Sequence, residues 1–161
     1  MLGLVRRISE QRHRLILSRA EPFLEEDEVV VQWVRARRTD GGGAGFIFLT
    51  DQQCVLVWTS KADDDVNVRW EDLSSWGFKL DAKGGPLVGV ETEHHGFFAQ
   101  VVAATGRMAE DVGSFIRRFS YLAGDPQKLL THPDHGPFHH HSSVHIDAEK
   151  KSIGGLTKRF M

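Results

Sequence analysis

The sequence predicts a mainly β domain, in which seven short strands form a bent barrel that is capped by a C-terminal α-helix and preceded by an additional N-terminal amphipathic helix. Three observations lead to this fold class. Residues 29–103 contain seven runs of β-branched, aromatic or alternating apolar residues. Short polar or glycine-containing turns separate these runs. Apolar residues recur at helical spacing both before and after them.

The strands are expected to alternate one buried face with one polar face. Val66, Val68 and Trp70 alternate with Asn67 and Arg69, which is the period of a half-buried strand. A meander of such strands has to bend, because one face of each strand must be hidden from water. The seven strands are expected at residues 29–38, 46–50, 54–60, 66–70, 76–81, 87–93 and 97–103.

The two helices follow from apolar stripes and end signals. Thr105 is expected to cap the C-terminal helix, and Gly124 and Pro126 to end it. Its stripe consists of Met108, Val112, Phe115, Ile116, Phe119 and Leu122. Residues 2–20 combine apolar and arginine residues into a basic amphipathic helix. We therefore expect three segments: this helix at 1–22, the β domain at 23–124, and a His-rich flexible tail at 125–161.

Composition narrows the class of protein. The chain has 161 residues and a formal net charge of −2, without the basic excess of a typical nucleic-acid binder. Cys54 is the single cysteine, so no intrachain disulfide can form and a reducing compartment is indicated. No run of 18 apolar residues and no secretory signal core occurs. These features predict a soluble, cytoplasmic protein that does not bind nucleic acid.

Three stretches carry a resemblance to a known family. They are the acidic FLEEDE (23–28), GFIFLTDQQCVLVW (45–58) and VRWEDLSSW (68–76). Together with the order of elements, they resemble the PH-like superfamily, in particular bacterial PH and GRAM-like domains, over about residues 24–123. In those relatives a basic residue often follows the Leu-Thr-Asp step, and here Gln52 and Gln53 follow it. The resemblance implies a binding module that presents the edge between its fifth, sixth and seventh strands, or its C-terminal helix, to peptides and proteins. It leaves assembly into homo-oligomers open.

The glycine run 41–45 is predicted to be a hairpin tip. A phosphate loop would need a following lysine and would lead into a helix, whereas this run leads into a strand. Arg35, Arg37 and Arg38 precede it, where the resemblance implies basic residues that bind inositol phosphates. Arg38 is expected on the opposite strand face from the other two, and three aspartates at 63–65 would each repel a phosphate by about 1 kcal/mol at 4 Å in water. Two interpretations of these arginines therefore remain. They form an anion-binding or lipid-binding site, or they lie at a solvated strand end and pair with the aspartates.

The N-terminal helix has two interpretations. Arg6 and Arg7, with the apolar residues beside them, can lie on an anionic membrane surface. Alternatively, the apolar stripe packs on the barrel or on a partner, and the arginines face the acidic residues 25–28. We favour packing, because Glu10 and that acidic segment dilute the attraction to lipid.

The tail offers two further candidates. Five histidines (His132, His135, His139, His140 and His141) can bind a metal ion, or they belong to a polar linker that Pro133 and Pro137 keep from being helical. The linker is favoured. The end of the chain forms a basic and apolar segment that either docks on a partner or is a frayed terminus. Its candidate docking residues are Ile153, Leu156, Lys158, Arg159 and Phe160.

No arrangement of residues predicts catalysis. His94 and His95 lie near Glu91 and Glu93, but they occupy a hairpin tip without a nucleophile. Cys54 begins an apolar strand and is expected to be buried. We expect a protein–protein interaction adaptor with no enzymatic activity and no cofactor. The alternative is peripheral association with anionic lipid at the inner face of the membrane, through the N-terminal helix and the arginines of the first strand.

Overall fold

The computed structural model describes residues 2–39, 42–59, 64–102, 108–124, 131–132 and 136–138. The helices are α1 (Leu2–Ser18) and α2 (Met108–Ala123). The strands are β1 (Val30–Arg37), β2 (Ala44–Thr50), β3 (Gln53–Trp58), β4 (Val66–Arg69), β5 (Ser75–Lys79), β6 (Leu87–Glu91), β7 (Gly96–Val102), β8 (Thr131–His132) and β9 (Gly136–Pro137). Within the described ranges, no helix is long and apolar enough to cross a membrane.

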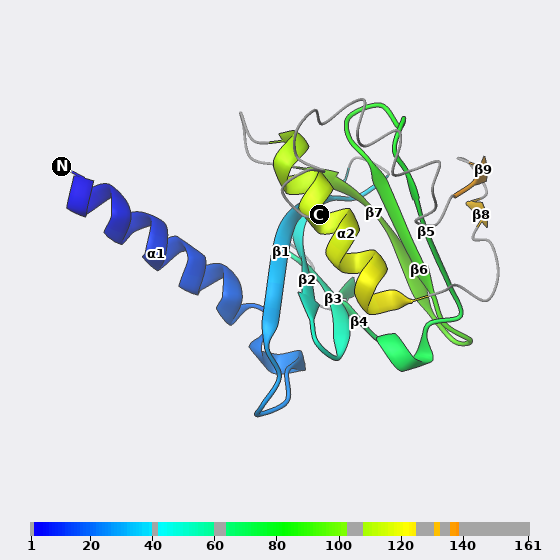
Figure 1. The fold of residues 1–161 in the computed structure, drawn as a ribbon, viewed down its shortest axis with the longest axis horizontal. Helices are drawn as coiled ribbons and strands as arrows, with labels where there is room; N and C mark the ends of the chain where they lie inside the picture. The colour runs from blue at the N-terminus through cyan, green and yellow to red at the C-terminus, as the bar shows by residue number, and fades with distance from the viewer. Residues whose placement is uncertain are drawn as a thin grey trace.

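Strands β1 to β7 form one antiparallel sheet in the order β4-β3-β2-β1-β7-β6-β5 (Figure 1). β1 pairs with β2 along its length and with β7 at Arg35–Arg37, so it joins the β1–β4 meander to the β5–β7 meander. β4 and β5 are the sheet edges. The sheet is not closed, so the expected seven-stranded bent barrel remains open between β4 and β5. The mainly β fold, its seven strands and both helices are confirmed, and the strand order with a C-terminal helix is consistent with a PH-like fold.

The strands begin and end close to their expected residues, but one residue adopts a different secondary structure from the one expected. Trp70 was expected in the fourth strand, but it begins a 3₁₀ turn, Trp70–Asp72. Its indole Nε1 donates a hydrogen bond to the Thr50 carbonyl oxygen at 2.9 Å. The tryptophan thus anchors the end of β4 to the end of β2.

Helix α2 packs its apolar stripe on the inner face of the sheet. Phe115 and Phe119 are fully buried, and the Phe119 ring lies 5.2 Å from Phe78 and 5.4 Å from Trp76. The indole Nε1 of Trp76 donates to the Gly124 carbonyl oxygen at 3.1 Å. Gly124 has φ of 72°, the left-handed conformation that commonly ends a helix. The expected packing of this helix on the strands is confirmed; Thr105 and Pro126 lie outside the described residues.

Among the described side chains of helix α1, those that contact the sheet lie near its C-terminal end, and Figure 1 shows the rest of the helix running away from the sheet. Ile16 and Ala20 are buried against the outer face of β2 and β3, whereas Leu15 is 62% exposed. His13 accepts a hydrogen bond from Trp33 Nε1 at 3.0 Å. The interpretation that the helix packs on the domain therefore holds for its last turns.

Part of the predicted flexible tail packs on the sheet. Thr131–His132 pairs with Gly136–Pro137, and the following Phe138 is fully buried. Phe138 contacts Leu87, and its ring lies 5.5 Å from that of Phe98. This contact was not predicted, because a single apolar residue among prolines and histidines has no periodicity. Residues 139–161 lie outside the described part of the chain.

Candidate functional site

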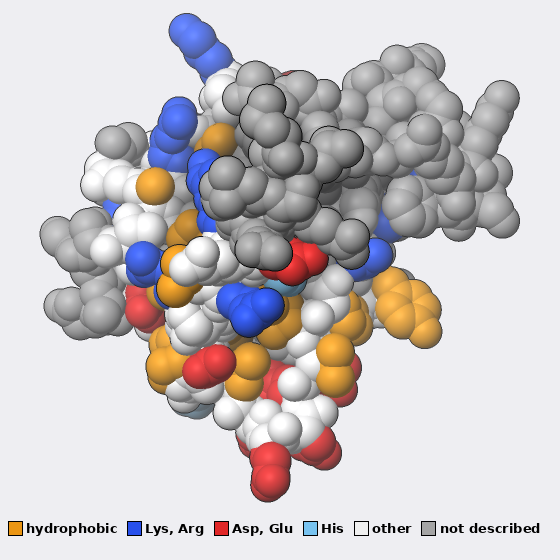
Figure 2. Space-filling model, turned by 90° about the vertical axis from the view of Figure 1, so that its left-hand side faces the viewer, with side chains coloured by type: hydrophobic (Ala, Val, Ile, Leu, Met, Phe, Trp, Pro, Cys, Tyr) orange, Lys and Arg blue, Asp and Glu red, His pale blue; other side chains and the backbone are white. Residues whose placement is uncertain are grey.

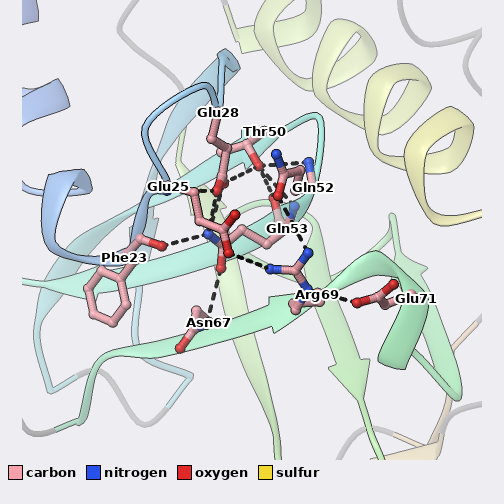
Figure 3. A network of polar contacts seen from close by, with 9 residues as sticks. All are labelled: Phe23, Glu25, Glu28, Thr50, Gln52, Gln53, Asn67, Arg69 and Glu71. Carbon is pink, nitrogen blue, oxygen red and sulfur yellow. Dashed lines mark hydrogen bonds and ion pairs between the residues drawn. The ribbon is translucent and has the colours of Figure 1, made fainter.

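The acidic FLEEDE stretch and the Leu-Thr-Asp-Gln-Gln step meet in one polar network (Figure 3). Gln53 is buried, and its Nε2 donates to the Phe23 carbonyl oxygen at 2.7 Å and to both oxygens of the Glu28 carboxylate at 3.0 and 2.8 Å. The Gln53 Oε1 accepts from Asn67 Nδ2 at 3.1 Å. Thr50 Oγ1 donates to Glu28 Oε2 at 2.6 Å. These contacts join the segment before β1 to β2, β3 and β4.

The turn between β2 and β3 is held by the same threonine. Thr50 Oγ1 accepts from the backbone N–H groups of Gln52 and Gln53 at 3.0 and 2.9 Å. Asp51 Oδ1 accepts from the Val29 N–H at 3.1 Å. The residues that carry the family resemblance therefore stabilise the fold, because their polar groups are used within the domain.

Arg69 completes this network at the surface. Its guanidinium donates to Glu71 at 2.9 Å and lies 3.5 Å from Glu25. The hydrogen bond that Arg69 donates to Glu71 raises the pKa of the Arg69 guanidinium. Among the described side chains, Glu25 and Glu28 thus contact residues of the β domain. The sequence analysis had instead expected the arginines of α1 to face these two glutamates.

The three arginines of the first strand do not converge. Arg35 and Arg37 lie on the outer face of β1, opposite the buried Val34 and Ala36. Arg38 instead places its guanidinium 4.3 Å from the centre of the Trp58 ring. The predicted divergence of Arg38 is thereby confirmed.

Arg38 is also paired with an aspartate, as the alternative to a phosphate site predicted. Its Nη2 lies 2.8 Å from Asp64 Oδ2, and the next residue, Asp65, accepts from the Trp58 N–H at 2.7 Å. The described end of the 61–65 turn therefore holds the β1 and β3 ends together. The glycine run joins β1 to β2 as a hairpin, as expected, since Arg37 pairs with Ala44.

A groove of about 610 Å³ lies between β1 and the last two turns of α2. We call it the β1–α2 groove; its lining residues are Val31, Arg117, Arg118, Tyr121 and Leu122. Tyr121 is 87% exposed and Val31 is 38% exposed, so two large side chains of the lining are open to solvent. Arg118 Nη1 donates to the Val31 carbonyl oxygen across the groove.

A second hollow, of about 370 Å³, surrounds the tip of the β6–β7 hairpin. His95 Nε2 lies 3.1 Å from the Asn67 carbonyl oxygen, and Thr92 Oγ1 accepts from the His95 N–H at 3.1 Å. His94 Nε2 lies 4.0 Å from the Glu93 carboxylate, with both side chains more than four-fifths exposed. Thr92 Oγ1 in turn donates to the His95 carbonyl oxygen at 2.9 Å, so these polar groups shape an exposed turn.

Metal and thiol chemistry receive no support from the described residues. No group of three or more His, Cys, Asp or Glu residues in the described ranges can hold a metal ion. His135 and His139–His141 lie outside those ranges, as do Ile153, Leu156, Lys158, Arg159 and Phe160; His132 lies in β8, without a described side chain. Cys54 is fully buried, as expected, and burial raises the pKa of its thiol.

Comparison with protein families and with curated proteins finds no match to this sequence. The solved structures that are similar to this chain at low identity include the following three. The C-terminal domain of an unknown protein from Leishmania infantum has a TM-score of 0.43 at 11% identity, over 57% of this chain and 84% of that one. The Vps36 N-terminal PH domain has a TM-score of 0.42 at 15% identity, over 62% and 82%. The hSac2 domain from human phosphoinositide phosphatase Sac2 has a TM-score of 0.45 at 12% identity, over 83% and 96%.

The β1–α2 groove was missed by the sequence analysis, although one signal was available. Arg117, Arg118 and Tyr121 lie three and four residues apart, so they share the helix face opposite the apolar stripe. An aromatic residue between cations on an otherwise polar face is typical of interaction surfaces. Nothing local in the sequence connects that face with Val31, which lies in another element.

Proposed function

We propose that this chain is a non-catalytic, PH-like binding module that acts as a protein–protein interaction adaptor. The observation that supports this role is the β1–α2 groove, where the exposed Tyr121 and Val31 lie beside Arg117 and Arg118. Exposed apolar side chains that gather in one place mark interaction sites, and tyrosine and arginine contribute more binding energy than most interface residues. The same hypothesis places the protein in the cytoplasm.

Affinity capture with the full chain as bait tests the adaptor role. We expect at least one protein to be recovered and to bind again when both proteins are purified. Tyr121→Ala should weaken this binding by about tenfold or more, because a truncated hot-spot residue costs at least about 1.4 kcal/mol. Leu15→Ala is the matched control, since Leu15 is also exposed but lies on α1. Recovery of background proteins alone would refute the adaptor role.

The docking segment at the end of the chain remains part of this proposal. A chain that ends at residue 138 removes Ile153, Leu156 and Phe160 but keeps the buried contacts of Phe138. We expect it to lose those partners that bind through the tail. If the shortened and full chains recover the same proteins in the same amounts, the tail does not dock.

Peripheral membrane association is the second candidate, and one observation favours it. The last turns of α1 pack on the outer face of β1–β3, the face that carries Arg35 and Arg37, while the rest of α1 runs away from the sheet (Figure 1). Figure 2 shows this side of the molecule, on which hydrophobic and basic side chains lie close together; acidic side chains gather toward the lower end, and a further acidic patch lies near the centre. Such a mixture is suited to a surface of anionic lipid.

Sedimentation with vesicles separates this candidate from the adaptor role. Vesicles of phosphatidylcholine with phosphatidylserine should carry the full chain down at low salt, and phosphatidylcholine alone should not. A chain that lacks residues 2–10 keeps the anchoring Ile16 and Ala20 and should remain in the supernatant. Equal recovery of the full and shortened chains with either vesicle would exclude membrane binding through α1.

A further inference from the structure

We infer that the β1–α2 groove binds an acidic peptide segment of a partner protein, with one bulky apolar side chain between carboxylates. This inference rests on the proposed adaptor role and adds the chemistry of the partner. The groove is formed by two elements that lie far apart in the sequence, and each supplies a different part of the recognition.

Strand β1 supplies one wall through a bulge. The β1–β2 register shifts between Val30 and Gln32, which leaves Val31 as the extra residue. A bulge of this kind turns the extra side chain out of the usual alternation, and Val31 faces the groove beside α2. Gln32 also faces α2, since its Oε1 accepts a hydrogen bond from Ser114 Oγ at 3.3 Å.

The same end of β1 is covered by side chains of α2. β1 pairs with β7 at Arg35–Arg37, and within the described residues no strand pairs with the β7-facing side of Val30–Val34. The Val31 carbonyl oxygen is instead bound by the Arg118 guanidinium. Because side chains of α2 cover this end of β1, a groove stays open beside it. A neighbouring strand would fill that space.

Helix α2 supplies the other wall and the charge. Tyr121 and Leu122 are its apolar part, and Arg117 and Arg118 are the charged side chains of the lining. Among the described lining residues none is a carboxylate, and Arg118 is exposed, so this part of the groove attracts anionic groups. A guanidinium binds a carboxylate through two parallel hydrogen bonds, which favours an acidic peptide.

The size of the groove suits a short peptide segment. Its volume of about 610 Å³ falls within the range of ligand-binding pockets. The formal net charge of −2 for the chain opposes an extended polyanion such as RNA. An apolar side chain seated on Val31, Tyr121 and Leu122, flanked by carboxylates, satisfies both parts of the lining.

Nuclear magnetic resonance on the full ¹⁵N-labelled chain tests the inference. The probe is the peptide Ser-Asp-Glu-Phe-Asp-Glu-Ser, with an Asn/Gln version and a version in which Ala replaces Phe as comparison peptides. We expect saturable shifts of the backbone amide signals of Val31, Tyr121 and Leu122, weakened by added salt. Both comparison peptides should bind at least about fivefold more weakly.

Matched variants assign the binding to the groove. Arg118→Gln and Tyr121→Ala should each weaken binding at least about fivefold, while their spectra keep the dispersion of a folded domain. Arg37→Gln and Leu15→Ala are the controls, because both residues are exposed and lie outside the groove. They should leave the affinity of the peptide unchanged.

Four results of the peptide experiment would overturn the inference. They are the absence of shifts at low salt, equal binding of the Asn/Gln peptide, shifts confined to other surfaces, and groove signals that change on dilution of the chain alone. The last result would assign the groove to a second copy of this chain. If captured partners bind the chain but are insensitive to Arg118→Gln and Tyr121→Ala, this inference fails while the adaptor role stands. If the peptide binds as expected but no partner is captured, the adaptor role fails instead.

Discussion

Gln53→Glu is the sharpest test of the polar network that joins the segment before β1 to the sheet. The substitution keeps the length of the side chain but replaces the Nε2 donor by a carboxylate oxygen. That oxygen would face the Glu28 carboxylate, whose oxygens lie 2.8 and 3.0 Å from Nε2 in the wild-type protein. Two like charges at 4 Å repel each other by about 4 kcal/mol at an effective dielectric constant of 20, and this pair would be closer.

The destabilisation of the Gln53→Glu variant has an upper limit, because the two carboxylates can share a proton. The cost of holding that proton in the folded state is about 1.4 kcal/mol for each pH unit above the unfolded glutamate pKa of about 4.3. At about pH 7 this amounts to about 4 kcal/mol, a large part of a typical free energy of unfolding of 5–15 kcal/mol. Loss of the hydrogen bond to the Phe23 carbonyl oxygen adds about 1 kcal/mol at every pH.

The pH dependence follows from the direction of the shift. The carboxyl pair in the folded variant has a raised pKa, so the penalty is full above that raised pKa and disappears as the pH falls to the unfolded value. Urea unfolding followed by tryptophan fluorescence at about pH 7 and about pH 4.5 should therefore give a loss of about 5 and about 1 kcal/mol, respectively.

Gln52→Glu is the matched control for this experiment. It makes the same chemical change one residue away, where the Gln52 Oε1 accepts from Arg69 Nη2 at 3.4 Å. A carboxylate at that position gains an attractive partner, so the free energy of unfolding should stay the same or rise slightly. A Gln53→Glu variant that loses less than about 1 kcal/mol at neutral pH, or the same amount at both pH values, would refute the buried contact with Glu28.

Three further predictions concern other contacts of the domain. Arg38→Gln removes the stacking on Trp58 and the ion pair with the half-exposed Asp64, and it should lower the free energy of unfolding by about 1 kcal/mol in urea titrations; no loss would place Arg38 in solvent. Phe138→Ala removes a fully buried ring, so limited proteolysis near residues 131–138 should become at least about tenfold faster; an unchanged rate would contradict the docked position. Burial raises the pKa of the Cys54 thiol, so the native thiol stays protonated while the unfolded one ionises above about pH 8.5. The stability of the wild type relative to Cys54→Ala should therefore fall by about 1.4 kcal/mol per pH unit above that value, and parallel stability curves would count against burial of the thiol.

The local pattern of the sequence was sufficient to predict the elements and their order. Val66 and Val68 alternate with polar residues, and this pattern predicted a strand that the structure confirms as β4. The stripe that contains Phe115 and Phe119 predicted a helix with one buried face. Such patterns can be detected in a sequence because a strand or helix repeats its orientation every two or 3.6 residues.

Several features depended on contacts between distant segments. Glu28 and Gln53 are 25 residues apart, and Gln52-Gln53 were noticed in the sequence only as a departure from the basic residue of the relatives. α1 was expected to pack through its stripe, yet it contacts the sheet through its last turns, around Ile16. Phe138 carries no periodic signal and is nevertheless fully buried.

The sequence by itself determined which faces of the strands and helices are apolar, and therefore that Cys54 is buried and that α2 covers the sheet. Only the tertiary structure decided which faces meet. It placed a bulged residue of β1, Val31, beside Tyr121 of α2, and it left the sheet open between β4 and β5. The physical reason is that periodicity reports the direction of each side chain relative to its own element, whereas the pairing of elements depends on the burial and hydrogen bonding of the whole chain at once.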